Sequence, residues 1–139
     1  MHIVRLFPLA ILFIAWLASP AGAVLQFYNV FKAEYLDNHP DQEFATFVKK
    51  PANRCFVCHQ GKVRKNHNPY GDHLVELLDR RKDAKNKEKI LAAIKQVEVL
   101  PFDPNDPDGE TYLDRIQASK WPGGELDDLK QEPDDSEEE

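Results

Sequence analysis

The chain has 139 residues and a formal net charge of −6, from 18 basic and 24 acidic side chains. This length is enough for one domain with a single hydrophobic core, and it excludes a larger multidomain architecture. The charge is uneven, because residues 125–139 contain nine acidic side chains and one lysine while residues 24–124 sum to about +1. The acidic tail cannot bury enough apolar area to fold, so residues 125–139 are predicted to be disordered and solvated.

Residues 1–23 have the layout of a secretory signal peptide. A short basic start at Arg5 precedes an apolar run over residues 6–18, and Ala21 and Ala23 form a small-x-small cleavage pattern. The apolar run is shorter than the ~20 residues that a bilayer span needs. We expect cleavage after Ala23 and a periplasmic or otherwise exported mature chain. If the signal is not cleaved, it anchors the protein to the membrane with its body on the non-cytoplasmic side.

Two amphipathic helices are predicted between the signal and the pair of cysteines. Apolar residues recur at helical spacing up to Tyr35, and this first helix ends near residues 38–40. Asp41 can cap a second helix, which Pro51 ends. The predicted apolar faces are Phe27, Phe31 and Tyr35 in the first helix, and Phe44, Phe47 and Val48 in the second.

The segment Cys55-Phe56-Val57-Cys58-His59 spells C-x-x-C-H, the attachment sequence of a c-type haem. Two thiols at this spacing lie on one side of a helical turn, from which they can reach the two vinyl groups at one edge of a porphyrin. His59 can then bind the iron through an imidazole nitrogen. The motif contains both cysteines of the chain. It predicts one covalent haem c, with Cys55 and Cys58 as anchors and His59 as the proximal iron ligand.

Three further helices are predicted after the motif, and no stretch shows the alternation of a strand. Asn68 can cap the first, with a proline at its first helical position; Asn86 can cap the second, and Asp108 can open the last. Their predicted apolar positions are Leu74, Leu77 and Leu78, then Ile90, Leu91, Ile94 and Val97, then Tyr112, Leu113 and Ile116. The fold class is therefore all-α, a bundle of short helices over residues 24–124.

The sixth ligand of the iron is open. The only methionine is Met1, which leaves with the signal peptide, so a His/Met pair is excluded. His67 is the first candidate, because the polar loop that carries it can fold back across the ring. His39, His73, another donor such as a lysine, or an iron with no protein ligand on that side remain alternatives, and a vacant position would suit a sensor or a small-ligand binder.

The two cysteines also allow zinc binding, thioredoxin-like redox chemistry or a disulfide. Cys55, Cys58, His67 and His73 have a spacing that zinc tolerates, which would make the chain a zinc-stabilised interaction module, but His59 would then be unexplained. A thioredoxin-like pair needs a βαβ context that the chain lacks, and a disulfide between the two cysteines gives no reason for the adjacent histidine. Residues 103–109 resemble a calcium loop but fail its register, because the twelfth position is an arginine.

A run of basic residues follows the haem motif. A basic rim around the edge of a haem would steer an acidic redox protein, although solvated helix faces explain the same charges. No nucleophile–base pair, phosphate loop or nucleic-acid signature appears, so we expect no enzyme activity, no nucleic acid and no small-molecule substrate. The basic residues are Lys62, Arg64, Lys65, Arg80, Arg81, Lys82, Lys85, Lys87 and Lys89.

With the C-x-x-C-H motif in place, the chain resembles the c-type cytochrome family. The sequence C-H-x-G at residues 58–61, R-K-N-H-N-P-Y-G at residues 64–71 and K-W-P-G-G at residues 120–124 look like small exported bacterial single-haem proteins. The resemblance implies a cytochrome c-like bundle around a haem c on Cys55 and Cys58, with His59 on the iron. It also implies electron transfer with unidentified redox protein partners.

Overall fold

The computed structural model describes residues 21–133, with side chains from Leu25 onward. Every regular element in this range is helical, which confirms the predicted all-α class. The elements are α1 (Ala21–Phe31), the π-helical turn η1 (Lys32–Leu36), α2 (Gln42–Lys49), the 3₁₀ turn η2 (Arg54–Val57), α3 (Pro69–Leu77), α4 (Lys87–Glu98), α5 (Tyr112–Gln117) and α6 (Leu126–Leu129). The only β-type pairings among these residues are isolated bridges between His59 and His67 and between Pro101 and Thr111.

The predicted signal peptide lies almost wholly outside the described residues. The described backbone starts at Ala21 in α1, close to the predicted cleavage point. Export and cleavage after Ala23 stay predictions. Within residues 21–133, no helix combines the length and the apolar character needed to cross a membrane.

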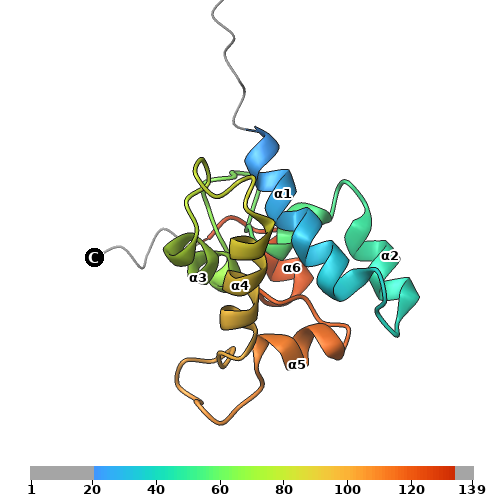
Figure 1. Ribbon diagram of the computed structural model, residues 1–139. Coiled ribbons are helices and arrows are strands. Elements are labelled where there is room, and N and C mark those ends of the chain that lie inside the picture. The colour runs from blue at the N-terminus through green and yellow to red at the C-terminus, as the bar shows by residue number, and fades with distance from the viewer. Residues whose placement is uncertain (1–20, 134–139) are drawn as a thin grey trace, which may run out of the picture.

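The core forms where α1 packs against α4, with α3 on α4 as well and η1 against α1 and α2 (Figure 1). Phe31 and Ile94 are among the most buried side chains, at 3% and 1% exposure. Burying an apolar side chain of this size contributes about 1.5–3 kcal/mol to folding, so the packing of α1 on α4 is a principal source of stability. Tyr35 of η1 adds a buried polar link, because its hydroxyl donates a 2.5 Å hydrogen bond to Glu98 of α4.

Three of the four predicted helix caps are confirmed. The side chains of Asp41, Asn68 and Asn86 each accept a hydrogen bond from the first turn of the helix that follows. The fourth is wrong, because Thr111 rather than Asp108 caps α5 and forms a capping box with Asp114. Residues 103–109 instead form turns, stabilised by the Asp103 carboxylate, which accepts from the Asn105 backbone N–H at 2.8 Å. That local bonding competes with a helix start in this loop.

Most predicted apolar positions are buried, but the face of α2 differs. Val48 is 1% exposed, as predicted, whereas Phe47 is 39% exposed and Ala45 takes the inward position. Phe47 packs edge-on against Trp121, with ring centroids 6.4 Å apart. The Phe47 ring therefore lies on the surface against Trp121 and does not fill the core.

The prediction that the disordered acidic tail begins at residue 125 is wrong for residues 125–132. Leu129 of α6 is 2% exposed, and its carbonyl accepts a 2.8 Å hydrogen bond from the backbone N–H of Gly61. Glu132 accepts from the backbone N–H of Lys62 at 2.8 Å and from the Asn66 amide at 3.1 Å. Leu129 belongs to the hydrophobic core and Leu126 packs against it, and these contacts hold the segment on the body. The acidic composition of the segment did not predict them. Residues 134–139 lie outside the described residues.

A buried arginine ties the C-terminal part of the body together. Arg115 of α5 is 5% exposed and donates to the carbonyl of Trp121 at 3.0 Å. Its guanidinium pairs with Glu110 at 3.0 Å and with Glu125 at 3.2 Å. Glu110 also pairs with Lys120 at 2.6 Å. The hydrogen bond from Lys120, followed by that from Arg115, lowers the pKa of Glu110 below its ordinary value of 4.5.

This pairing predicts a pH-dependent effect of Glu110→Gln. A carboxyl group with a lowered pKa stabilises the fold above its unfolded-state pKa, and that contribution is lost as the pH falls through the folded-state pKa. We expect the substitution to cost about 1–2 kcal/mol at pH 7, and the difference from wild type to shrink as the pH drops below 4.5. Urea unfolding at a series of pH values measures both. Glu125→Gln is the control, and a cost for it equal to that of Glu110→Gln would contradict the assignment, because the Glu125 side chain is 75% exposed.

Candidate functional site

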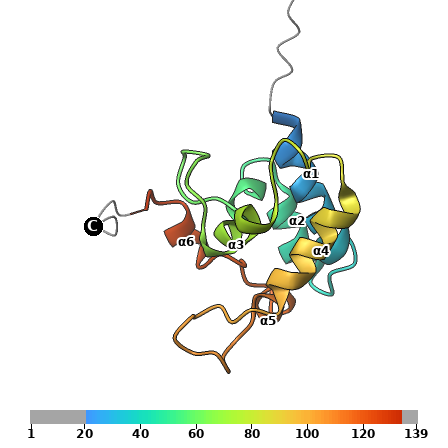
Figure 2. The ribbon, with the colours of Figure 1, turned by 60° about the vertical axis from the view of Figure 1, so that its left-hand side comes forward.

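The three residues of the C-x-x-C-H motif predicted to bind haem line one cavity. Cys55, Cys58 and His59 form part of its wall, and the cavity has a volume of about 350 Å³. The rest of the wall comes from α1, from α3 and from the segments that flank them, and Figure 2 shows where α1 and α3 lie in the fold. Its apolar lining is Leu25, Phe27, Leu74, Val75 and Leu78. A concave, mostly apolar site of this volume is typical of small-molecule and cofactor sites.

The two cysteines sit at a tight turn and not in a regular α-helix. The carbonyl of Cys55 accepts from the backbone N–H groups of both Cys58 and His59, at 3.2 and 2.9 Å. Both thiols are free, and burial raises the pKa of Cys58 to about 12. The Cys58 thiol is therefore protonated at neutral pH.

His59 is held in one tautomer. Its side chain is buried, and Nδ1 donates to the carbonyl of Asn66 at 3.3 Å, which leaves Nε2 unprotonated and able to bind a metal. Burial, reinforced by the neighbouring His67, lowers the pKa of His59. The imidazole is thus neutral at pH 7. Asn66 is itself positioned because its carbonyl also accepts from the Gln60 backbone N–H at 3.1 Å.

Asn68 supports the motif from behind, a role that its sequence position did not reveal. Its side chain is fully buried and caps α3 by accepting from the Gly71 N–H at 2.9 Å. The same side chain donates to the carbonyls of Phe56, at 2.9 Å, and Val57, at 3.3 Å. Sequence reasoning identified only the cap. The one available signal was that Asn68 lies within the second stretch shared with the resembled proteins.

Two glycines allow this support to come close. A Cβ on Gly71 would overlap the carbonyl oxygen of Cys58, so α3 packs its first turn directly on the backbone of the motif. A Cβ on Gly123 would overlap the amide of Asn68. The residues around Gly71 and Gly123 are therefore part of the structural support of the cysteine turn.

His67 lines the same cavity as the motif residues. A backbone bridge pairs it with His59, and the two ring centroids lie 5.1 Å apart with an angle of 32° between the ring planes. The bridge places both side chains on the same side of the backbone, and the role of His67 as sixth ligand stays a prediction.

The other two candidate histidines do not line the cavity. His39 is buried, and its Nε2 lies 2.8 Å from the carbonyl of Ile116. His73 packs edge-on against Tyr112, with ring centroids 5.7 Å apart. Across residues 21–133, no three His, Cys, Asp or Glu side chains group in a way that could hold a metal ion. The four residues of the zinc alternative are therefore not assembled into a site.

One polar group in the cavity wall lacks a partner. The Tyr28 side chain is 9% exposed, and its hydroxyl oxygen is buried without a hydrogen bond to any described residue. Burial raises the pKa of Tyr28, so the phenol keeps its proton and can donate. An unsatisfied buried hydroxyl costs about 1–3 kcal/mol, which a ligand oxygen in the cavity would offset.

No protein-family model, curated protein or solved structure matches this chain.

Proposed function

We propose that this protein is an exported, single-haem c-type cytochrome that carries one electron at a time, with a cytochrome c-like bundle around the haem. One observation carries the proposal. Two thiols and a neutral imidazole with a free Nε2 converge on one apolar cavity. This donor set suits a covalently bound haem, and the unpartnered hydroxyl of Tyr28 fits a ligand that carries oxygen acceptors.

The cysteines, the histidine and the apolar wall each have a defined role in this proposal. The thiols of Cys55 and Cys58 would each add across one vinyl group, with sulfur bonding to one carbon and the thiol hydrogen passing to the other, so that no oxidant would be consumed. His59 would hold the iron through Nε2, and its hydrogen bond to Asn66 keeps the ring oriented. The apolar wall excludes water, and the bound haem supplies reversible one-electron chemistry.

The test is production of the full chain in a host that installs haem c. The protein purified from the exported fraction is expected to keep the mass of one haem after acid–acetone denaturation. It is also expected to show sharp absorption bands on reduction and to cycle reversibly between two oxidation states. A mature chain without added tetrapyrrole mass would overturn the proposal, and zinc in a colourless protein would favour the interaction module instead.

A second candidate function is the binding of a small ligand at the iron. It is favoured by one observation, that neither His39 nor His73 lines the cavity, while the bridge places His67 on the same side as His59. A five-coordinate iron binds carbon monoxide without displacing a protein ligand. The haem-based sensor and the electron carrier therefore differ in their coordination number.

The substitution His67→Ala tests whether His67 is a sixth ligand of the iron. We expect it to leave the coordination number of the haem spectrum unchanged, because the bridge places the His67 side chain on the same side as that of His59. His73→Ala is the matched control, since that ring packs on Tyr112 outside the cavity. Absorption spectra of both oxidation states, with and without carbon monoxide, provide the measurement. Conversion of a six-coordinate spectrum to a five-coordinate one by His67→Ala alone would make His67 the sixth ligand.

A further inference from the structure

Three arginines from separate segments line the cavity. Arg54 begins η2, Arg64 lies in the loop after the motif, and Arg80 follows α3. No aspartate or glutamate is among the lining residues. A chain with a net charge of −6 thus surrounds an apolar cavity with positive charge alone.

None of these guanidinium groups has an ion-pair partner within residues 21–133. Arg115 shows the contrast, because its guanidinium is paired with Glu110 and Glu125. Like charges that gather without counter-charges repel one another, and a bound anion removes that cost.

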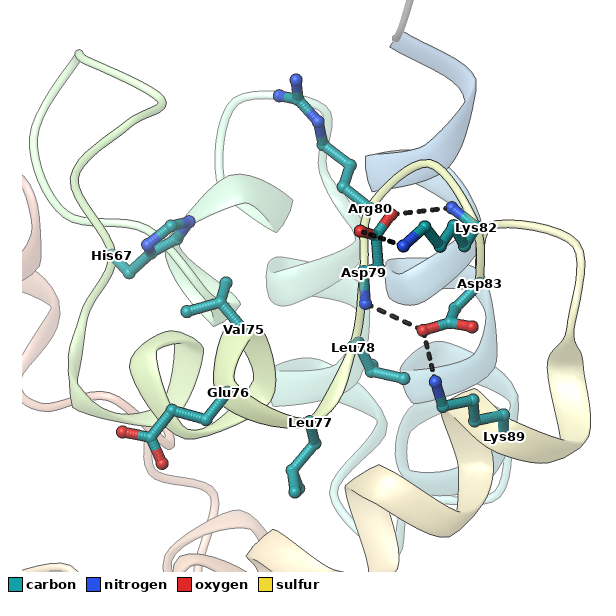
Figure 3. A pocket seen from close by; sticks show the side chains of 10 residues that line it. All are labelled: His67, Val75, Glu76, Leu77, Leu78, Asp79, Arg80, Lys82, Asp83 and Lys89. Carbon is teal, nitrogen blue, oxygen red and sulfur yellow. Dashed lines mark hydrogen bonds and ion pairs between the residues drawn. The ribbon is translucent and has the colours of Figure 1, made fainter.

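The two carboxylates close to Arg80 in the sequence have other partners. Asp83 accepts from Lys89 Nζ at 2.6 Å and from the Asp79 backbone N–H at 2.8 Å. Asp79 accepts from the backbone N–H groups of Arg81 and Lys82, each at 2.8 Å. Figure 3 shows the guanidinium of Arg80 extending away from this group of contacts. It is therefore free to serve the cavity, which Arg80 also lines.

We propose that Arg54, Arg64 and Arg80 form a carboxylate-binding cluster that holds the two propionate groups of the bound haem. This inference rests on the proposed function. Besides the two vinyl groups that Cys55 and Cys58 would take up, haem carries two propionates, whose negative charges need cationic partners. A guanidinium binds a carboxylate through two parallel hydrogen bonds. Tyr28 supplies a further donor from the wall, where its hydroxyl lacks a partner.

The test uses the haem-loaded full chain and the variants Arg54→Gln, Arg64→Gln and Arg80→Gln, singly and combined. Because the haem is covalent, the variants keep it, and the midpoint potential can be compared directly. Cationic groups beside the haem disfavour the more positive oxidised iron. We expect the triple variant to shift the equilibrium about tenfold toward the oxidised form, which corresponds to about 59 mV for one electron. The resonance Raman bands of propionate bending should shift as well.

Arg81→Gln is the matched control. Arg81 is exposed, adjacent to Arg80 and not part of the cavity wall, so it removes the same charge without touching the cluster. Variants that match Arg81→Gln in potential and in Raman bands would overturn the inference. A change only in the salt-dependent rate with an acidic redox protein would also overturn it, and would assign the arginines to partner docking. Denaturing mass is measured first, so that a wild type without haem reports failure of the proposed function and not of the cluster.

Discussion

Replacing Cys55 and Cys58 together by alanine is expected to remove all covalently held haem. Both thiols line the cavity beside His59, and no other cysteine is present to substitute for either. Each single variant keeps one thioether and leaves one vinyl group conjugated with the ring, so its reduced absorption bands should move to longer wavelength. Mass spectrometry after acid–acetone treatment and absorption spectra of the reduced protein measure the two effects.

The control for this experiment is His73→Ala, which should retain the full complement of haem because His73 packs on Tyr112 outside the cavity. A double cysteine variant that still retained porphyrin after denaturation would show that the attachment lies elsewhere. Equal loss in the histidine control would point to general misfolding and not to the missing thioethers. Circular dichroism of the haem-free double variant then checks that its helical content is kept.

Substituting Asn68 by alanine is expected to destabilise the protein by about 3 kcal/mol. About 1 kcal/mol of this is the lost cap of α3. The remainder arises because the carbonyls of Phe56 and Val57 lose their donor in a buried setting, at a cost of about 1–3 kcal/mol. Urea unfolding of the haem-free and haem-loaded chains gives the free energies. The haem-free variant should also load haem less completely, since the cysteine turn loses its support.

The variant Asn86→Ala separates the loss of a helix cap from the loss of the hydrogen bonds to the carbonyls of Phe56 and Val57. Asn86 caps α4 through an exposed hydrogen bond to the Lys89 N–H at 3.0 Å, and it touches no motif carbonyl, so its loss should cost only about 1 kcal/mol. Asn68→Asp adds a second comparison, because its carboxylate can still accept from Gly71 but cannot donate. Equal costs for Asn68→Ala and Asn86→Ala would mean that the contacts with the motif carbonyls contribute nothing.

Capping and helical class could be predicted from the sequence because both depend on residues within one turn. Asp41, Asn68 and Asn86 each bind an amide three residues ahead, and this contact requires no knowledge of the fold. The same reasoning failed at Asp108, where several neighbouring aspartates could each bind local amides. Thr111 caps α5 instead, because its hydroxyl accepts from the Asp114 backbone N–H while the Asp114 carboxylate accepts from the Thr111 backbone N–H.

The local order of residues thus determined the all-α class and most of the helix starts, and it contains the C-x-x-C-H motif from which haem c is predicted. Only the packed chain decided that His67 stands beside His59, that Asn68 donates to the motif, that Leu129 docks residues 125–132, and that three arginines gather at one cavity. Each of these depends on which segments meet after folding. Such meetings are governed by the burial of side chains distant in sequence, and no spacing rule along the chain encodes them.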